Sequence, residues 1–188
     1  MIRDEDVAEA LSDIYRKTPK LYNLEVPGQR VQMDVCKITN DLYQYTAIDD
    51  CTRYKILNIY PKKTANCTVD FINMAIKEMH FPIQRFQTDR GKEFFAYEVQ
   101  ELMQKNKIKF RPIKPRSPHL NGKVERSQRT DLDEFYSDTN PKEDPNLEIK
   151  LKDWQNHYNN KRSHTSLNGR TPLEQLNDKK MKLDCSIF

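Results

Sequence analysis

Three carboxylates stand where acids are not expected. Asp34 lies in the middle of the β-rich run "VQMDVCKI", although Asp is disfavoured inside strands. Asp89 ends another β-rich run, "IQRFQTD", and Glu125 is the sole acid among nine Lys and Arg residues between positions 105 and 130. Brought together, such groups repel one another unless a cation or a proton lies between them. Because carboxylates supply only oxygen ligands, they suit Mg²⁺ or Mn²⁺ rather than zinc.

Each acid also has an ordinary structural explanation. Asp34 could be an edge-strand acid that faces solvent, and Asp89 could cap the helix that follows it. Glu125 could pair with Arg129 one helical turn later, an interaction worth only about 0.3 to 0.5 kcal/mol. None of these explanations accounts for the three acids as a set.

A site with two metal ions about 4 Å apart would support phosphoryl transfer, because one ion activates the attacking oxygen and the other stabilises the leaving 3' oxygen. The window around Glu125 favours a phosphodiester substrate: nine cations and one acid give it a charge of +8, whereas the whole chain carries +4. Cations beside such a site hold the phosphodiester backbone and read little sequence. The candidate contacts to a nucleic-acid backbone are Lys114, Arg116, His119, Asn121, Lys123, Arg126 and Arg129.

The elements that must position these residues begin with three β-rich runs. The gaps between the runs, "TND" and "DCTR", have the composition of turns. Two such short gaps in succession require an antiparallel meander. The runs cover residues 31–38, 42–49 and 54–62.

Helical and strand patterns then alternate. Thr64 is a plausible N-cap for the first helix, and Phe95, Val99 and Leu102 form the apolar stripe of the second. The order βββαβαβ predicts an α/β fold of the ribonuclease H-like type, a mixed five-stranded sheet with helices on both faces, in which Asp34 and Asp89 lie on neighbouring strands. The expected ranges are 64–80 (helix), 83–89 (strand), 91–106 (helix) and 107–113 (strand).

A Pro-rich loop over residues 113–121 follows, and then helices over 122–136 and 147–160 and a tail that closes with "TPLEQL". Between Lys114 and His119 the loop holds two prolines and no apolar anchor. We therefore predict that the loop is mobile in the free protein.

The sequence resembles the catalytic core of retroviral integrases and insertion-sequence transposases, the DDE polynucleotidyl transferases. Asp89 and Glu125 are separated by 35 residues, the spacing that gives the D,D(35)E motif its name. The ending "YNNKRSHTSLNGRTPLEQL" is similar to that of bacterial insertion-sequence transposases. The other matching pieces are "VQMDV", "IDDCTRY", "QTDRGKEF" and "RPIKPRSPHLNGKVER".

This resemblance implies that Asp34, Asp89 and Glu125 bind two Mg²⁺ (or Mn²⁺) ions. It also implies hydrolytic nicking at an element's end, followed by attack of the freed 3' hydroxyl on target DNA, by an enzyme that works at least as a dimer. Two alternatives stay open: a non-catalytic DNA-binding or dimerisation remnant, and a nuclease that cuts without joining. The implied parts are an N-terminal helical linker or remnant (1–27), the catalytic core (28–136) and a C-terminal helical extension with its tail (137–188).

The remaining features suggest structural roles. Short apolar runs and an acidic N-terminus exclude a membrane span and a secretion signal, so we expect a cytoplasmic protein with four free thiols. Asp49 and Asp50 read as turn residues, since successive strand side chains face opposite ways. We expect Glu93 to complement a helix dipole. Trp154 and Tyr158 are expected to form a packing pair.

Overall fold

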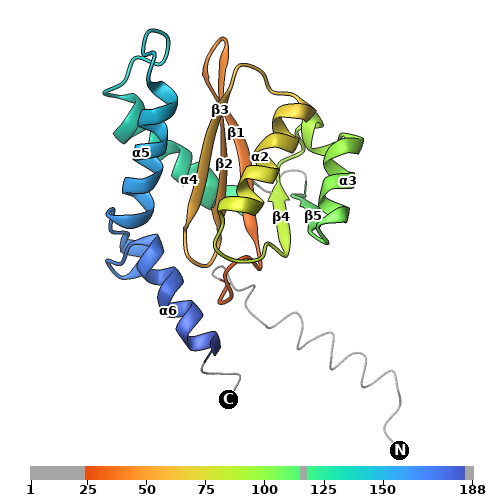
Figure 1. The fold of residues 1–188 in the computed structure, drawn as a ribbon, viewed down its shortest axis with the longest axis vertical. Coiled ribbons are helices and arrows are strands. Elements are labelled where there is room, and N and C mark those ends of the chain that lie inside the picture. Colours follow the sequence, from red (N-terminus) through yellow and green to blue (C-terminus); the bar gives the residue numbers. More distant parts are fainter. Residues whose placement is uncertain (1–23, 115–117, 185–188) are drawn as a thin grey trace, which may run out of the picture.

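A mixed five-stranded sheet forms the centre of the protein (Figure 1). The structure is a computed structural model that describes residues 24–114 and 118–184. The sheet order is β3-β2-β1-β4-β5; β1, β2 and β3 are antiparallel, whereas β4 and β5 run parallel to β1. This topology confirms the predicted ribonuclease H-like fold. The strands are β1 (Val31–Thr39), β2 (Leu42–Asp49), β3 (Lys55–Tyr60), β4 (Arg85–Thr88) and β5 (Lys109–Pro112).

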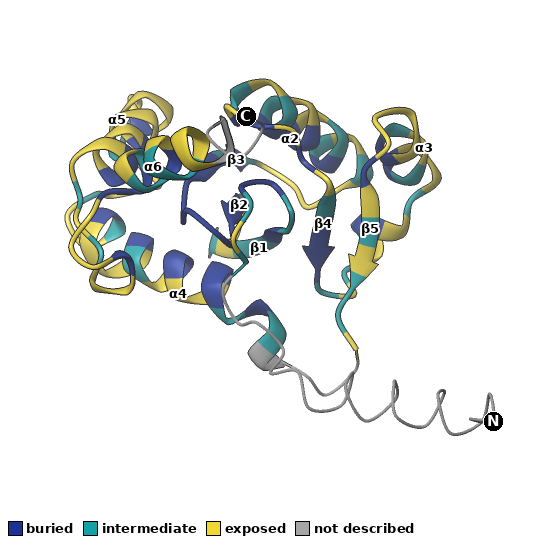
Figure 2. Ribbon diagram, turned by 90° about the horizontal axis from the view of Figure 1, so that it is seen from below, coloured by how far each residue is buried: buried dark blue, intermediate teal, exposed yellow. Residues whose placement is uncertain are grey.

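Helices cover both faces of the sheet, as predicted. Helices α2 and α3 lie on one side and α4 on the other, with the buried sides of all three turned toward the strands (Figure 2). Helix α5 packs along β3, at the edge of the sheet. The helices are α2 (Ala65–Glu78), α3 (Tyr97–Lys105), α4 (Gly122–Asp131), α5 (Leu147–Asn160) and α6 (Pro172–Asp184).

The two faces of the sheet differ in chemistry. Val31, Met33 and Tyr45 point toward α2 and belong to the main apolar core, together with Phe71 of α2. Tyr45 lies 4.9 Å from Tyr60, centroid to centroid, so these aromatic residues of the meander pack in the core. The face toward α4 instead buries polar side chains. They are Gln32, Gln44, Thr46 and Lys55.

The helix boundaries differ from the prediction in three places. The helix expected over 91–106 is a 3₁₀ turn, Lys92–Phe95, followed by α3, because the chain is extended at Ala96. The predicted apolar stripe was therefore wrong at Phe95, which is 48 % exposed. The helix expected over 122–136 changes to π-helical geometry at Leu132–Tyr136, and the closing "TPLEQL" begins α6 instead of a tail.

The exposed edge of β3 is closed by side chains of α5. The Asn159 amide accepts from the Lys55 backbone N–H (3.0 Å) and donates to its carbonyl (2.8 Å), while Gln155 Oε1 accepts from the Leu57 N–H (2.6 Å). An unpaired strand edge invites association with other chains. Side chains of α5 therefore satisfy backbone groups of β3 that a neighbouring strand would otherwise bond. Leu147 and Leu151 of α5 also pack against Leu57 and Ile59 of β3.

A buried ion pair lies behind this edge. Lys55 Nζ pairs with the Asp131 carboxylate at the end of α4, and both side chains are fully buried. The same carboxylate accepts from Trp154 Nε1 (2.7 Å) and from Gln44 Nε2 (2.9 Å). Tyr158 completes the cluster, because its ring centroid lies 3.5 Å from Lys55 Nζ. The expected packing of Trp154 near Tyr158 is confirmed, and the Lys55 ammonium lies over both rings.

Among the residues that the structure describes, no helix combines the length and apolar character needed to cross a membrane. Cys36, Cys51 and Cys67 are free thiols, as predicted, and Cys185 lies outside the described residues. The predicted N-terminal linker also lies largely outside them, since residues 1–23 are not described.

We predict that Asp131→Ala lowers the free energy of unfolding by about 3 to 5 kcal/mol, because it leaves the Lys55 ammonium buried and unpaired. Urea unfolding measures the change. The double variant Lys55→Met with Asp131→Leu should lose less than Asp131→Ala alone. Asp133→Ala, an exposed control on the same stretch of chain, should stay within about 0.5 kcal/mol of the wild type. Equal losses for the two alanine variants would contradict a structural role for this pair.

Candidate functional site

Asp34 and Asp89 occupy equivalent positions on neighbouring parallel strands. The register pairs Met33 of β1 with Thr88 of β4. Asp34 comes directly after Met33, and Asp89 comes directly after Thr88. Both acids are partly buried. The prediction that the first and fourth strands lie side by side is therefore confirmed, and it brings the two carboxylates to one place on the sheet.

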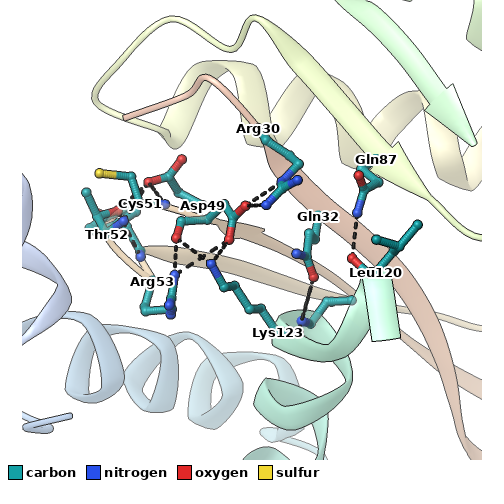
Figure 3. A network of polar contacts seen from close by, with 12 residues as sticks. Arg30, Gln32, Asp49, Cys51, Thr52, Arg53, Gln87, Leu120 and Lys123 are labelled. Atoms are coloured by element: carbon teal, nitrogen blue, oxygen red, sulfur yellow. Dashed lines mark hydrogen bonds and ion pairs between the residues drawn. The ribbon is translucent and has the colours of Figure 1, made fainter. Parts of the chain in front are cut away.

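Two buried glutamines in the same register hold the segment that carries Glu125. Gln32 pairs with Gln87 across β1 and β4, and each precedes a candidate acid by two residues. Gln87 Nε2 donates to the carbonyl of Leu120 (2.6 Å), just before α4. Figure 3 shows Gln32 reaching the first turn of α4 beside this contact.

Gln32 acts as the N-cap of α4 from a distant strand. Asn121 occupies the N-cap position but makes no side-chain capping bond. Gln32 Oε1 instead accepts from the backbone N–H groups of Lys123 and Val124, both at 3.2 Å. Free N–H groups at a helix start need such partners. Because side chains two apart on a strand share a face, α4 begins on the face toward which Asp34 points.

Glu125 lies in the first turn of α4 and is exposed. The pKa of Asp34 is raised to about 6, chiefly by burial; a backbone hydrogen bond at Val35 opposes the shift, and the charges of Asp89 and Glu125 contribute to the rise. The charges of Asp89 and Glu125 therefore act on Asp34 and disfavour its ionisation.

The donor chemistry of these acids fits Mg²⁺ or Mn²⁺, since all three supply oxygen. Within residues 24–114 and 118–184, however, no three His, Cys, Asp or Glu side chains are gathered tightly enough to hold an ion. The strands and α4 nevertheless bring the three acids to the same face of the sheet.

Lys63 is a neighbour of the acids that sequence reasoning missed. Its ammonium lies 3.0 Å from a carboxylate oxygen of Glu93. Burial alone would lower the pKa of Lys63, but Glu93, Asp89 and Asp34 raise it above its ordinary value. Glu93, expected to complement a helix dipole, lies in the first turn of the 3₁₀ segment and also joins this ion pair. No spacing in "YPKKT" marks Lys63, because only the tertiary fold brings the β3–α2 loop to the acids.

The candidate DNA contacts divide into exposed and buried groups. Lys114, Arg126 and Arg129 are exposed, and Arg129 lies 3.7 Å from Asp133. Lys123 is only 6 % exposed, and Asn121 only 1 %. Residues 115–117 lie outside the described residues, and so does the side chain of His119. The predictions made for Arg116, for His119 and for the mobility of this loop therefore remain predictions.

The Lys123 ammonium is directed inward, toward a buried carboxylate. It pairs with the Asp50 carboxylate, which also accepts from the Arg30 guanidinium and forms an ion pair with Arg53, 3.7 Å away. Burial lowers the pKa of Lys123 to about 8, and the hydrogen bond to Asp50 opposes this shift. Lys123 thus anchors the start of α4 to the β2–β3 turn, which the basic composition of the window did not reveal.

The turn itself is held by Asp49, as expected for a structural acid. Its carboxylate accepts from the backbone N–H groups of Gly28 and Thr52, each at 2.8 Å. Gly28 has φ of +76°, and a Cβ at that position would lie 2.0 Å from the carbonyl oxygen of Pro82. The structural interpretation of Asp49 and Asp50 is confirmed.

Comparisons with known proteins identify the family and the fold. Residues 25–118 match a family model described as "Integrase core domain", and residues 106–172 match a second model with the same description. A curated relative, the "Putative integrase ORF3" of Spiroplasma virus SpV1-C74, is 30 % identical over 151 residues. That alignment covers 72 % of this chain but 42 % of the relative, so the chain spans less than half of the relative's length.

Solved structures share the fold. The catalytic core domain of BIV integrase has a TM-score of 0.66 at 22 % identity and covers 82 % of this chain and 97 % of its own. The simian T-cell lymphotropic virus intasome, in complex with PP2A regulatory subunit B56 gamma, has a TM-score of 0.71 at 19 % identity, with coverages of 90 % and 66 %. The HTLV-2 integrase catalytic core domain in complex with magnesium (trimeric form) scores 0.65 at 19 % identity, with coverages of 79 % and 96 %.

We predict that Gln32→Leu lowers the free energy of unfolding by about 1 to 3 kcal/mol, because two N–H groups of α4 lose their buried acceptor. Thermal or urea unfolding measures the loss. Gln100→Leu is a matched control, since the Gln100 side chain donates to the carbonyl of Phe94, away from α4. A Gln32→Leu variant as stable as the wild type would show that α4 does not depend on this cap.

Proposed function

The chain belongs to the integrase core domain family, and on that premise we propose that it is the catalytic domain of an integrase or transposase. The proposed activity is metal-dependent cleavage of a DNA strand followed by strand transfer, the chemistry of DNA integration and transposition. The observation that carries this proposal is the common register of Asp34 and Asp89, on the face where α4 presents Glu125.

We propose that Asp34, Asp89 and Glu125 bind two metal ions, which are Mg²⁺ or Mn²⁺. When bound, such ions would supply an activated attacking oxygen and stabilise the leaving 3' oxygen. A magnesium complex of the HTLV-2 catalytic core, a fold relative, supports this choice.

The chain's own residues have positioning roles in this proposal. Gln32 and Gln87 orient the start of α4, and with it Glu125, toward the two strand acids. Lys63 holds Glu93 beside the site and places a cation next to Asp34 and Asp89. The exposed cations Lys114, Arg126 and Arg129, with Arg116 and His119, would hold the phosphodiester backbone without reading sequence.

The partners we propose are the DNA ends of a mobile element, the target DNA and further copies of the chain. Joining two ends to one target uses more than one active site, which favours at least a dimer. Among the fold relatives, the simian virus structure is an intasome and the HTLV-2 core is described in trimeric and dimeric forms. With DNA as the proposed substrate, we also propose that the protein acts inside a cell.

We predict that the chain joins a 3'-hydroxyl DNA end to target DNA in Mg²⁺ or Mn²⁺. Asp34→Asn and Glu125→Gln should each lower joining by at least about a hundredfold, because several kcal/mol of charge stabilisation are lost. Glu148→Gln, which neutralises an exposed acid on α5, should join like the wild type. Gel separation of labelled DNA products measures cleavage and joining separately.

The same gel decides between this proposal and its rivals. Cleavage without joining would identify a nuclease on the same fold. A folded wild-type protein that neither cleaves nor joins would identify a DNA-binding or dimerisation remnant. Full joining by Glu125→Gln would remove Glu125 from the site.

A further inference from the structure

A basic cavity lies between α4 and the segment that follows α5. It encloses about 540 Å³ and is lined by cationic side chains of Arg53, Lys123, Arg126 and Arg162, and by several hydroxyl groups. No carboxylate is among its lining residues in the part of the chain that the structure describes. We call it the α4–α5 cavity.

The α4–α5 cavity is separate from the three acids. It is lined on α4 by Lys123, Ser127 and Thr130, which follow one another at helical spacing along a single side. At about 3.6 residues per turn, Glu125 points some 160° away from Lys123 around the helix axis. One side of α4 therefore serves the candidate metal site, and the opposite side forms a wall of the cavity.

Three cations of the cavity form ion pairs with acids that do not line it. Asp50 pairs with Lys123 and Arg53, and Glu134 pairs with Arg162. Neither Asp50 nor Glu134 lines the cavity. The cationic side chains are thus held in place by buried or flanking acids, while the inner surface keeps a positive charge.

His164 reports this positive field from inside the cavity. Its pKa is lowered to about 4, chiefly by burial and in addition by the positive charges of Arg162 and Lys55. Its Nε2 is buried and has no hydrogen-bond partner among the described residues. A neutral imidazole with an unpaired nitrogen is available to a hydrogen-bonding ligand that enters the cavity.

The outer rim is a hydrogen-bonded turn rich in hydroxyl groups. Ser163, Thr165 and Ser166 are exposed at the rim. The turn is closed by hydrogen bonds from the His164 N–H to the Arg170 carbonyl and from the Gly169 N–H to the His164 carbonyl, both 3.0 Å. These residues belong to "YNNKRSHTSLNGRTPLEQL", a stretch that the metal site leaves without a role.

We propose that the α4–α5 cavity binds backbone phosphates of duplex DNA, as a second contact separate from the reacting phosphodiester. The choice of DNA as the polyanion rests on the proposed function. From Lys123 to Thr130 the wall runs about 10 Å along α4, and each DNA strand carries one phosphate per about 3.4 Å of its axis. The wall is therefore long enough for a run of backbone and larger than one free anion requires.

Binding of a fluorescent DNA duplex to the full chain, in EDTA and over a range of salt concentrations, tests this proposal. Ser166→Asp places a carboxylate at the rim, and Arg126→Gln removes an exposed cation. Each should weaken binding roughly tenfold at low salt, and Arg126→Gln should reduce the slope of log K against log salt by about 1. The matched control is Lys77→Gln, which removes an exposed cation from α2 on the other side of the sheet and should bind like the wild type.

Two outcomes would overturn the proposal. One is wild-type affinity and salt slope in both cavity variants. The other is a cavity that takes only a small anion: inorganic phosphate would then raise the thermal unfolding midpoint of the wild type but not of Ser166→Asp, with duplex affinity unchanged. Since EDTA removes the metal reaction, failure of the joining assay leaves this binding difference intact, and the two proposals fail independently.

Discussion

The buried Asp131 carboxylate is the interaction on which the arrangement of α4 depends. It joins Lys55 of β3, Gln44 of β2 and Trp154 of α5 at one point. Taking both charges of an ion pair out of water is costly, and the cost is offset only when geometry and further hydrogen bonds satisfy both groups. These contacts fix where the end of α4 lies relative to β2, β3 and α5.

The start of α4 is set by a second polar contact. Gln32 supplies the acceptor for the first turn, and Lys123 reaches from that turn to Asp50. With both ends tied to the polar face of the sheet, the direction of α4 is determined, and so is the side on which Glu125 lies. The opposite face of the sheet, with Met33 packed against Phe71, belongs to the larger apolar core, whose burial stabilises the fold. The polar face can therefore carry the side chains that position the site.

Helix α4 consequently presents different chemistry on opposite sides. Toward Asp34 and Asp89 it offers an acid, and toward the α5–α6 turn it offers cations and hydroxyl groups. Acids that bind a cation and cations that bind a polyanion would neutralise each other if they were mixed on one surface. A single helix keeps them about one helix diameter, roughly 10 Å, apart while still holding them in a fixed relation.

The sequence by itself determined the strands, their order and the positions of Asp34 and Asp89, because alternation, turn composition and short gaps act over a few residues. It also indicated that Asp49 and Asp50 hold a turn. It did not reveal the roles of Gln32, Gln87 or Lys63, or the buried pairing of Lys123 with Asp50. Those assignments depend on partners far away in the chain, as between Lys123 and Asp50 or Gln32 and α4. Only the tertiary structure decided them, since the burial of a polar side chain is settled by which distant groups can satisfy its hydrogen bonds and its charge.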